Sequence, residues 1–302
     1  MAKPPQRERT IDSIPTHNAS TSGDLTEAQV AEFEACGVLV LEGYVAAAEC
    51  RRLKARVREL VDAFDPQTVR TIFSTTRQTQ LNDRYFYESG DKIRFFFEDG
   101  AFDDEGELRQ SKHDSLNKMG HAMHDLDPVF EAFSRTPKLA RTVASLGLED
   151  PGVIQSMYIF KPPGIGGEVT CHQDSTFIYT EPESCIGFWF AIDDATGDNG
   201  CMNFVPGAHK LPLRKRNRRL ANGQFVIETV DETPWPSSGW VPAEARVGSL
   251  VIFHGRMPHK SGANNSPRSR HAYTLHVIDR QCHYPADNWL QRSEDLPLRG
   301  FE

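Results

Sequence analysis

Short apolar runs separated by turn residues fill the second half of this 302-residue chain and restrict the folds that it can adopt. Runs bounded by glycine, proline and asparagine are typical of the short strands of a β sandwich or barrel. Helical patterns dominate the first half, so we predict an α+β fold in which helices flank a β-rich core. The strand-like runs lie at 154–161, 168–174, 185–193, 201–205, 248–254 and 270–279.

The first half begins with a polar segment, residues 1–24, that carries scattered proline and serine and is expected to form a disordered tail. Thr26 and Gln29 make a capping box, which predicts the start of a helix. Apolar spacing then predicts a strand at 37–45, a long helix at 46–64, and helices around 115–124 and 127–146.

Aromatic residues gather at 84–100, where turn chemistry between Glu88 and Asp91 separates two aromatic-rich runs. This pattern predicts a β-hairpin. Phe95, Phe96 and Phe97 do not alternate in character, so at least one ring is expected either to cover a ligand as part of a lid or to pack into the core.

Charge and cysteine content narrow the classes of partner and compartment. The net charge of −8 gives the chain no overall attraction to nucleic acid or anionic membranes. The basic run at 214–219 is read as a solvated loop or as a contact for substrate phosphates. Six scattered cysteines are too sparse for a disulfide scaffold, and neither a membrane-spanning run nor a secretory signal is recognised. We therefore expect a cytoplasmic monomer that acts on a small molecule.

The sequence "CHQD" places a histidine and a carboxylate two residues apart. If this segment is a strand, His172 and Asp174 point to one face and Gln173 to the other. One imidazole and one carboxylate, completed by a distal histidine, form the facial triad of non-haem Fe(II) oxygenases. An isolated pair of this kind is more often structural, so the distal residues must supply the specificity.

Two histidines and two arginines are candidates for the distal part of the site. His254 ends an apolar strand, and His259 follows a short link. An oxygenase that uses 2-oxoglutarate also needs a cation for the distal carboxylate of that acid, and arginine binds carboxylates through two parallel hydrogen bonds. Arg268 and Arg270 share one strand face, so alternation leaves both open.

The pattern of His172-x-Asp174, Trp189, "NGCMNFVPGAHK" (199–210), His259 and Arg270 resembles the phytanoyl-CoA dioxygenase family over roughly residues 26–290. This resemblance implies a double-stranded β-helix, or jelly roll, that uses Fe(II), 2-oxoglutarate and O₂. The oxygenase domain would then span 25–302, with the jelly-roll core at about 150–280.

The resemblance also implies individual residue roles. The eleven-residue interval from His259 to Arg270 matches that of the family and selects these two residues over His254 and Arg268. It assigns iron binding to His172, Asp174 and His259. It assigns 2-oxoglutarate contacts to Lys118, Met157, Trp189, Ser261 and Arg270, although Met157 and Trp189 would otherwise be read as core residues and Lys118 as a surface residue.

These expectations together describe a dioxygenase that hydroxylates a small hydrophobic or acyl-type substrate and releases succinate and CO₂. The carboxylate of Asp174 favours hydroxylation, because halogenases of this type have alanine or glycine at that position. The alternatives are a zinc-dependent hydrolase, since two histidines and a carboxylate also bind catalytic Zn²⁺, and a non-catalytic binding protein on the same fold.

Overall fold

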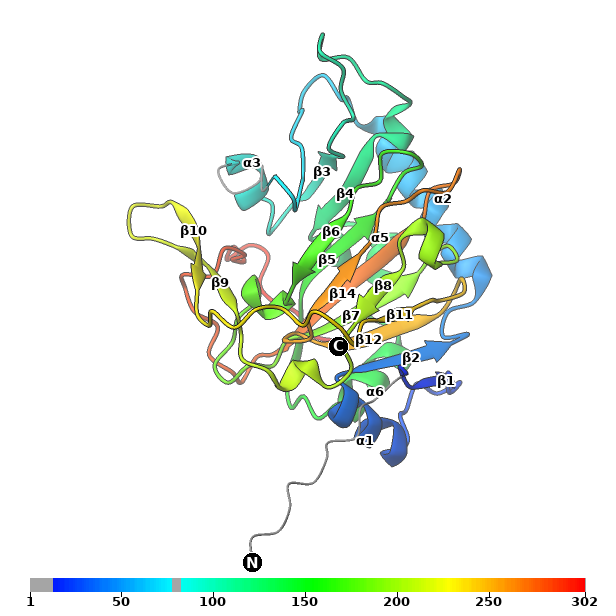
Figure 1. The fold of residues 1–302 in the computed structure, drawn as a ribbon, viewed down its shortest axis with the longest axis vertical. Coiled ribbons are helices and arrows are strands. Elements are labelled where there is room, and N and C mark those ends of the chain that lie inside the picture. Colours follow the sequence, from blue (N-terminus) through cyan, green and yellow to red (C-terminus); the bar gives the residue numbers. More distant parts are fainter. Residues whose placement is uncertain (1–12, 78–82, 302) are drawn as a thin grey trace, which may run out of the picture.

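The computed structural model describes residues 13–77 and 83–301 and contains two β-sheets that face each other, with helices on the outside (Figure 1). The large sheet is almost entirely antiparallel and has eight strands in the order β1-β2-β12-β7-β14-β5-β4-β3. The strands of this sheet are β1 (Thr16–Asn18), β2 (Val38–Glu42), β12 (Leu250–His254), β7 (Ile186–Ala191), β14 (Ala272–Asp279), β5 (Pro151–Ile159), β4 (Leu116–His121) and β3 (Ile93–Phe97).

The small sheet has four strands in the order β11-β8-β13-β6, and a separate hairpin joins β9 to β10. The strands of the small sheet are β11 (Val241–Ala243), β8 (Met202–Phe204), β13 (His259–Ser261) and β6 (Val169–His172), and those of the hairpin are β9 (Lys215–Arg219) and β10 (Phe225–Thr229). The helices are α1 (Glu27–Cys36), α2 (Ala47–Ala63), α3 (Arg84–Tyr87), α4 (Met123–Leu126), α5 (Pro128–Ser134) and α6 (Pro137–Ser145).

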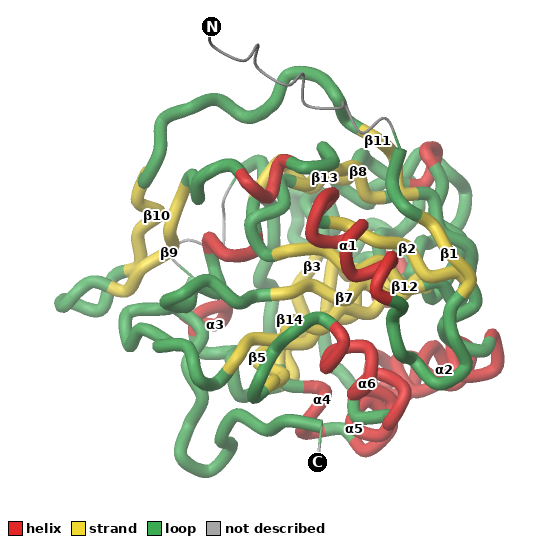
Figure 2. Tube along the Cα trace, turned by 90° about the horizontal axis from the view of Figure 1, so that it is seen from below, coloured by secondary structure: helices red, strands yellow, loops and turns green. Residues whose placement is uncertain are grey.

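Both faces of the large sheet are buried, as the layers in Figure 2 show. On one face, Val40, Trp189 and Val251 pack against Phe204 of the small sheet. On the other face, Phe188 and its neighbours share a core with the apolar sides of α2, α5 and α6. A strand covered on both faces is apolar throughout, which explains why β7 and β12 do not alternate. This arrangement confirms the predicted α+β fold with a double-stranded β-helix core.

Several local predictions agree with the structure. Thr26 and Gln29 form the expected capping box, and Gly37 ends α1 in the left-handed conformation. Helix α2 matches the helix expected at 46–64, and β2 lies within the run at 37–45. The six strand-like runs beyond residue 153 each overlap a strand, although β9, β10, β11 and β13 were not anticipated.

Three other predictions of secondary structure were wrong. The hairpin expected at 84–100 is a short helix, α3, followed by the edge strand β3. The helix expected around 115–124 is mainly β4, which is hydrogen-bonded between β3 and β5. The helix expected at 127–146 is divided into α5 and α6, because Thr136 caps a new helix that begins with a proline.

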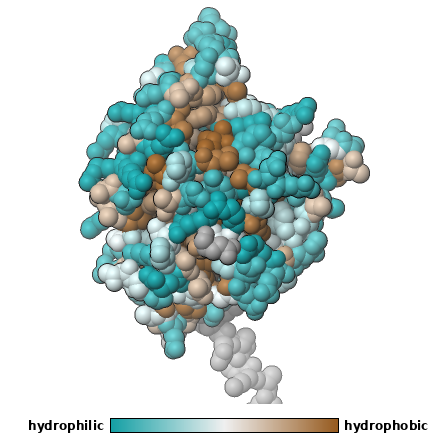
Figure 3. All heavy atoms as spheres, turned by 180° about the vertical axis from the view of Figure 1, so that it is seen from behind, coloured by the Kyte–Doolittle hydropathy of each residue, from teal (hydrophilic) through white to brown (hydrophobic). Residues whose placement is uncertain are grey.

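Part of the segment expected to form a disordered tail is a strand of the large sheet. Residues 1–12 lie outside the described part of the chain, but β1 pairs in parallel with β2 and thereby joins the large sheet. Among the described residues, no helix is long and apolar enough to cross a membrane. Figure 3 shows the back of the molecule, where hydrophilic residues dominate and apolar residues gather mainly in the upper half.

Candidate metal centre and co-substrate pocket

Three side chains from neighbouring parts of the small sheet converge on one point. His172, the last residue of β6, pairs in register with His259, the first residue of β13. Asp174 Oδ1 lies 3.5 Å from His172 Nε2 and 3.6 Å from His259 Nε2. One ligand atom from each of the three residues lies within 4.8 Å of the others, a spacing that suits a single metal ion.

The reason for this convergence differs from the one inferred from alternation. Strand β6 ends at His172, and Asp174 begins a 3₁₀ turn (Asp174–Thr176). This turn, rather than a shared strand face, brings the carboxylate beside the imidazole. Gln173 faces elsewhere, as predicted, because its amide donates to the carbonyl oxygens of Pro212 and Arg256 and accepts from the Arg214 N–H.

Backbone carbonyls orient both imidazoles. His172 Nδ1 lies 2.9 Å from the Thr170 oxygen, and His259 Nδ1 lies 3.0 Å from the Met257 oxygen. An Nδ1–H that donates to a carbonyl leaves Nε2 as the lone-pair nitrogen, which is the form that binds metals. Both Nε2 atoms therefore face Asp174 and are available to bind a metal ion.

The surroundings of His259 and Asp174 keep these two candidate ligands deprotonated at neutral pH. Burial lowers the pKa of His259 to about 4, and the neighbouring His172 adds to that effect. For Asp174, burial alone would raise the pKa, but the imidazoles of His276 and His259 hold it well below its ordinary value. Metal ligands must be deprotonated, so these shifts favour binding.

The fourth side chain at this centre, His276, was missed from the sequence. Its Nε2 lies 2.9 Å from Asp174 Oδ2, the carboxylate oxygen that does not face the two histidines. His276 follows Thr274 by two residues on β14, so both lie on the same face of that strand. Period-two alternation from Arg270 onward would have pointed to it.

The competing distal residues lie elsewhere. His254 Nδ1 accepts from the Arg256 N–H, and its ring packs near that of His209. Arg268 is exposed, whereas Arg270 is only 2% exposed. Neither His254 nor Arg268 reaches the triad or the cavity beside it, as far as the described residues show.

A cavity of about 250 Å³ opens beside the triad and is lined by all five residues expected to contact 2-oxoglutarate: Lys118, Met157, Trp189, Ser261 and Arg270. Arg270 Nη2 donates to the Gly200 carbonyl at 3.0 Å, while Nε and Nη1 have no hydrogen-bond partner within the described ranges. A buried guanidinium with free donors is costly unless an anion joins it, so this end of the cavity fits a carboxylate.

The motif "NGCMNFVPGAHK" helps to position Arg270. Gly200 has a φ of +80°, and a Cβ at this position would lie 2.3 Å from the side chain of Lys161 and 2.5 Å from the Gly262 oxygen. Only glycine therefore brings its carbonyl this close to the arginine. The backbone of this turn thus contributes to the pocket by accepting a hydrogen bond from Arg270, and Met202 of the motif lines the cavity.

Two buried lysines flank the cavity. Lys118 Nζ lies 3.1 Å from the centre of the Phe73 ring and 3.9 Å from Met157 Sδ, and burial lowers its pKa to about 7. Lys161, which was not predicted, donates to the Gly167 oxygen at 2.8 Å and to Ser261 Oγ at 2.9 Å. Burial and the nearby Arg270 lower the pKa of Lys161 to about 7 as well.

Phe177 and Phe86 of α3 are among the aromatic residues that line the cavity, whereas Tyr179 packs against Arg216. Phe95, Phe96 and Phe97 are all buried, which confirms the alternative that these rings pack into the core.

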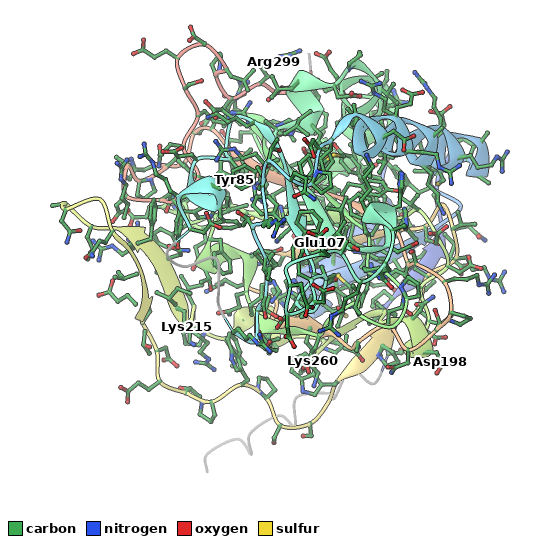
Figure 4. All side chains as sticks on the ribbon, turned by 90° about the horizontal axis from the view of Figure 1, so that it is seen from above. Tyr85, Glu107, Asp198, Lys215, Lys260 and Arg299 are labelled. Atoms are coloured by element: carbon green, nitrogen blue, oxygen red, sulfur yellow. The ribbon has the colours of Figure 1, made fainter. Side chains whose placement is uncertain are left out.

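The basic run is a strand rather than a solvated loop. Arg214 pairs with Asp231, and Arg216 and Arg218 pair with Asp287. Lys215 lines the cavity from β9, and Lys260 lines it from β13; both are labelled in the lower half of Figure 4.

Comparisons with known proteins agree with this architecture. The sequence model of phytanoyl-CoA dioxygenase (PhyH) matches residues 33–272. A phytanoyl-CoA dioxygenase of Arabidopsis thaliana is 46% identical over 277 residues, which cover 90% of this chain and 96% of that protein. Phytanoyl-CoA dioxygenase domain-containing protein 1 of Danio rerio is 44% identical over 283 residues, covering 91% and 97%.

Among solved structures, the non-haem α-ketoglutarate-dependent carbocyclase SnoK of nogalamycin biosynthesis superposes with a TM-score of 0.63 at 17% identity, covering 93% of this chain and 99% of SnoK. EctD from S. alaskensis, crystallised with 2-oxoglutarate and 5-hydroxyectoine, gives a TM-score of 0.58 at 17% identity, covering 93% and 94%. These likenesses concern the fold.

Proposed function

Since the chain belongs to the phytanoyl-CoA dioxygenase family, we propose that His172, Asp174 and His259 bind its catalytic Fe(II) and that the cavity beside them holds 2-oxoglutarate. The protein is an Fe(II)- and 2-oxoglutarate-dependent dioxygenase. We further propose that it hydroxylates a small hydrophobic or acyl-type substrate and releases succinate and CO₂.

The observation that carries the proposal is the pairing of the triad with Arg270 across one cavity. The triad offers ligands on one side of a metal site, and Arg270 offers two free donors at a carboxylate-binding end. A zinc hydrolase would have no use for that buried cation. Phe73, Phe86, Phe177, Ile178 and Trp289 form apolar walls, which supports a hydrophobic substrate.

The residues of the chain position the reactants and limit the access of water. Bound iron and 2-oxoglutarate, together with O₂, supply the oxidising chemistry. Arg270 and Lys118 are proposed to hold the distal carboxylate of the co-substrate, while Trp189 and Met157 form the apolar floor beneath its chain. Ser261, whose Oγ accepts a hydrogen bond from Lys161, would donate its own O–H to the co-substrate carboxylate at the same end.

The basic residues in and beside strand β9 indicate which acidic groups of a substrate the cavity could accept. Arg216 and Arg218 of this strand form ion pairs with Asp287, and Arg214, just before the strand, forms one with Asp231. These arginines are therefore poorly placed to bind the phosphates of coenzyme A. Lys215 is the residue of this run that reaches the cavity. An acyl-type substrate would therefore meet Lys215 and Lys260 with its acidic group.

A library of small hydrophobic acids and acyl-CoA esters, screened by consumption of 2-oxoglutarate, tests this proposal. The expected result is succinate formation that a substrate stimulates and that Asp174→Ala abolishes. Substrate turnover that persists at the wild-type rate in Asp174→Ala would remove this carboxylate from the iron site.

A further inference from the structure

The two carboxylate oxygens of Asp174 have different partners. Oδ1 lies between the Nε2 atoms of His172 and His259, at 3.5 and 3.6 Å. Oδ2 lies 2.9 Å from His276 Nε2, which is the geometry of a normal hydrogen bond. One oxygen is thus directed to the metal position and the other to a fourth side chain.

His276 is buried in a strand that is paired on both sides. It is 3% exposed and lies in the middle of β14, where it pairs in register with Gln155 of β5 on one side and Gly187 of β7 on the other. Its Nδ1 has no hydrogen-bond partner among residues 13–77 and 83–301. The contact with Asp174 is therefore the polar interaction that the described chain provides for this ring.

We propose that His276 is a positioning residue that fixes Asp174 as a ligand through a single oxygen; this inference rests on the proposed function, because it assumes that the triad binds Fe(II). The terminal torsion of an aspartate is broad and nearly two-fold, so an unassisted carboxylate can rotate or bind through both oxygens. A donor on Oδ2 prevents both and keeps a further coordination position open.

The location of the donor is also informative. His276 comes from the large sheet, whereas all three proposed ligands come from the small sheet or the turn that follows it. Arg270 lies just before the same strand, β14. Strand β14 and the residues just before it therefore position both Arg270, at the carboxylate-binding end of the cavity, and His276, beside the metal-binding aspartate.

Two variants test the role of the donor. His276→Phe keeps a planar ring of similar size but has no N–H, whereas His276→Gln offers an amide N–H near the position of Nε2. Fe(II) affinity is measured anaerobically by competition with a coloured chelator, alongside thermal unfolding of the metal-free proteins. We expect Fe(II) binding to weaken about 10- to 100-fold in the phenylalanine variant and to be largely restored in the glutamine variant.

The outcomes separate this inference from the proposed function. Wild-type protein that fails to bind Fe(II) would overturn the proposed function and this inference with it. Wild-type protein that binds Fe(II) no better than His276→Phe would overturn this inference alone, as would a glutamine variant as defective as the phenylalanine variant.

A second measurement does not depend on the folding of any variant. In a crystal structure of wild-type protein with Mn²⁺ and 2-oxoglutarate, we expect one Asp174 oxygen on the metal and the other within hydrogen-bond distance of His276 Nε2. A bidentate Asp174, or a His276 ring turned away from it, would contradict the inference.

Discussion

At the scale of single residues, the candidate site contains buried cationic side chains whose charges are not balanced by an acidic side chain in contact with them among the described residues. Arg270 has two unsatisfied donors, and Lys118 faces an aromatic ring and a thioether rather than an oxygen acceptor. Burying cations in this way opposes folding and is offset when an anion binds. The pocket is thus organised for a carboxylate that the chain itself does not provide.

Arg270→Leu should weaken 2-oxoglutarate binding more than any other single change in the cavity. Removing one partner of a buried, hydrogen-bonded charge pair costs about 2–5 kcal/mol, which corresponds to roughly 30-fold or more in affinity. The dissociation constant can be measured by calorimetry in the presence of Mn²⁺. The exposed Arg268 is the matched control, and Arg268→Leu should bind within about twofold of wild type. Equal losses in both variants would show that Arg270 has no special role.

Lys118 should make co-substrate binding depend on pH. Its pKa of about 7 means that the ammonium form, which attracts a carboxylate, is lost as the pH rises through neutrality. The affinity for 2-oxoglutarate should therefore fall between pH 6 and pH 9. Lys161, whose pKa is also about 7, adds a similar dependence, so Lys118→Met should flatten the profile without abolishing it. A profile unchanged by Lys118→Met would exclude this lysine from the binding site.

At the scale of secondary-structure elements, the packing between β7 and β12 places one of the proposed ligands. Gly187 of β7 lies opposite Phe253 of β12, and a Cβ at this position would come within 2.5 Å of the Phe253 ring. That ring in turn lies 4.8 Å from the ring of His259. The absence of a side chain at Gly187 lets Phe253 lie flat across the strand and support the histidine.

Gly187→Ala should therefore disturb the metal centre from the opposite sheet. The added methyl group forces the Phe253 ring toward His259, and overpacking of this kind costs about 1–3 kcal/mol. We expect weaker Fe(II) binding together with a lower melting temperature. Adding Phe253→Leu to the Gly187→Ala variant should restore Fe(II) binding, because the smaller side chain leaves room for the new methyl group. If Gly187→Ala loses only stability and keeps wild-type iron affinity, Phe253 does not position His259.

The elements also show what the sequence could predict. The capping box and six of the strands beyond residue 153 follow local rules, and they were predicted correctly. Strand β4 was mistaken for a helix, because its pairing with β3 and β5 cannot be read from the segment alone. His276 and Lys161 were missed for a related reason, since their contacts with Asp174 and Ser261 join distant parts of the chain. Family resemblance, rather than alternation, distinguished His259 from His254.

At the scale of the whole molecule, one buried ionic cluster ties the C-terminal segment to the helical layer. The side chain of Asp125, fully buried in α4, contacts Arg135, Arg292 and Arg299. Burial alone would raise the pKa of Asp125, but the hydrogen bond from His124 and the charges of Arg292 and Arg135 hold it below its ordinary value. The carboxylate thus links residues that are more than 160 positions apart.

Asp125→Asn should destabilise the folded chain strongly, because it leaves buried guanidinium groups without a counter-charge. Breaking a buried pair in this way costs about 3–5 kcal/mol, and urea unfolding at pH 7 measures it. The pKa is depressed in the folded state, so this stabilisation is present above the unfolded pKa of about 3.9 and is lost as the pH falls below it. Asp24→Asn, which removes a half-exposed carboxylate near Arg141, is the control and should cost less than about 1 kcal/mol. Equal costs for the two variants would refute the proposed importance of the cluster.

The central claim, that His172, Asp174 and His259 hold iron beside a 2-oxoglutarate pocket, is tested most directly by anaerobic absorption spectroscopy. Adding Fe(II) and 2-oxoglutarate to wild-type protein should produce a weak visible charge-transfer band, and His172→Ala should not produce it. A wild-type protein that gives no band, while Zn²⁺ supports hydrolysis of a substrate, would contradict the claim.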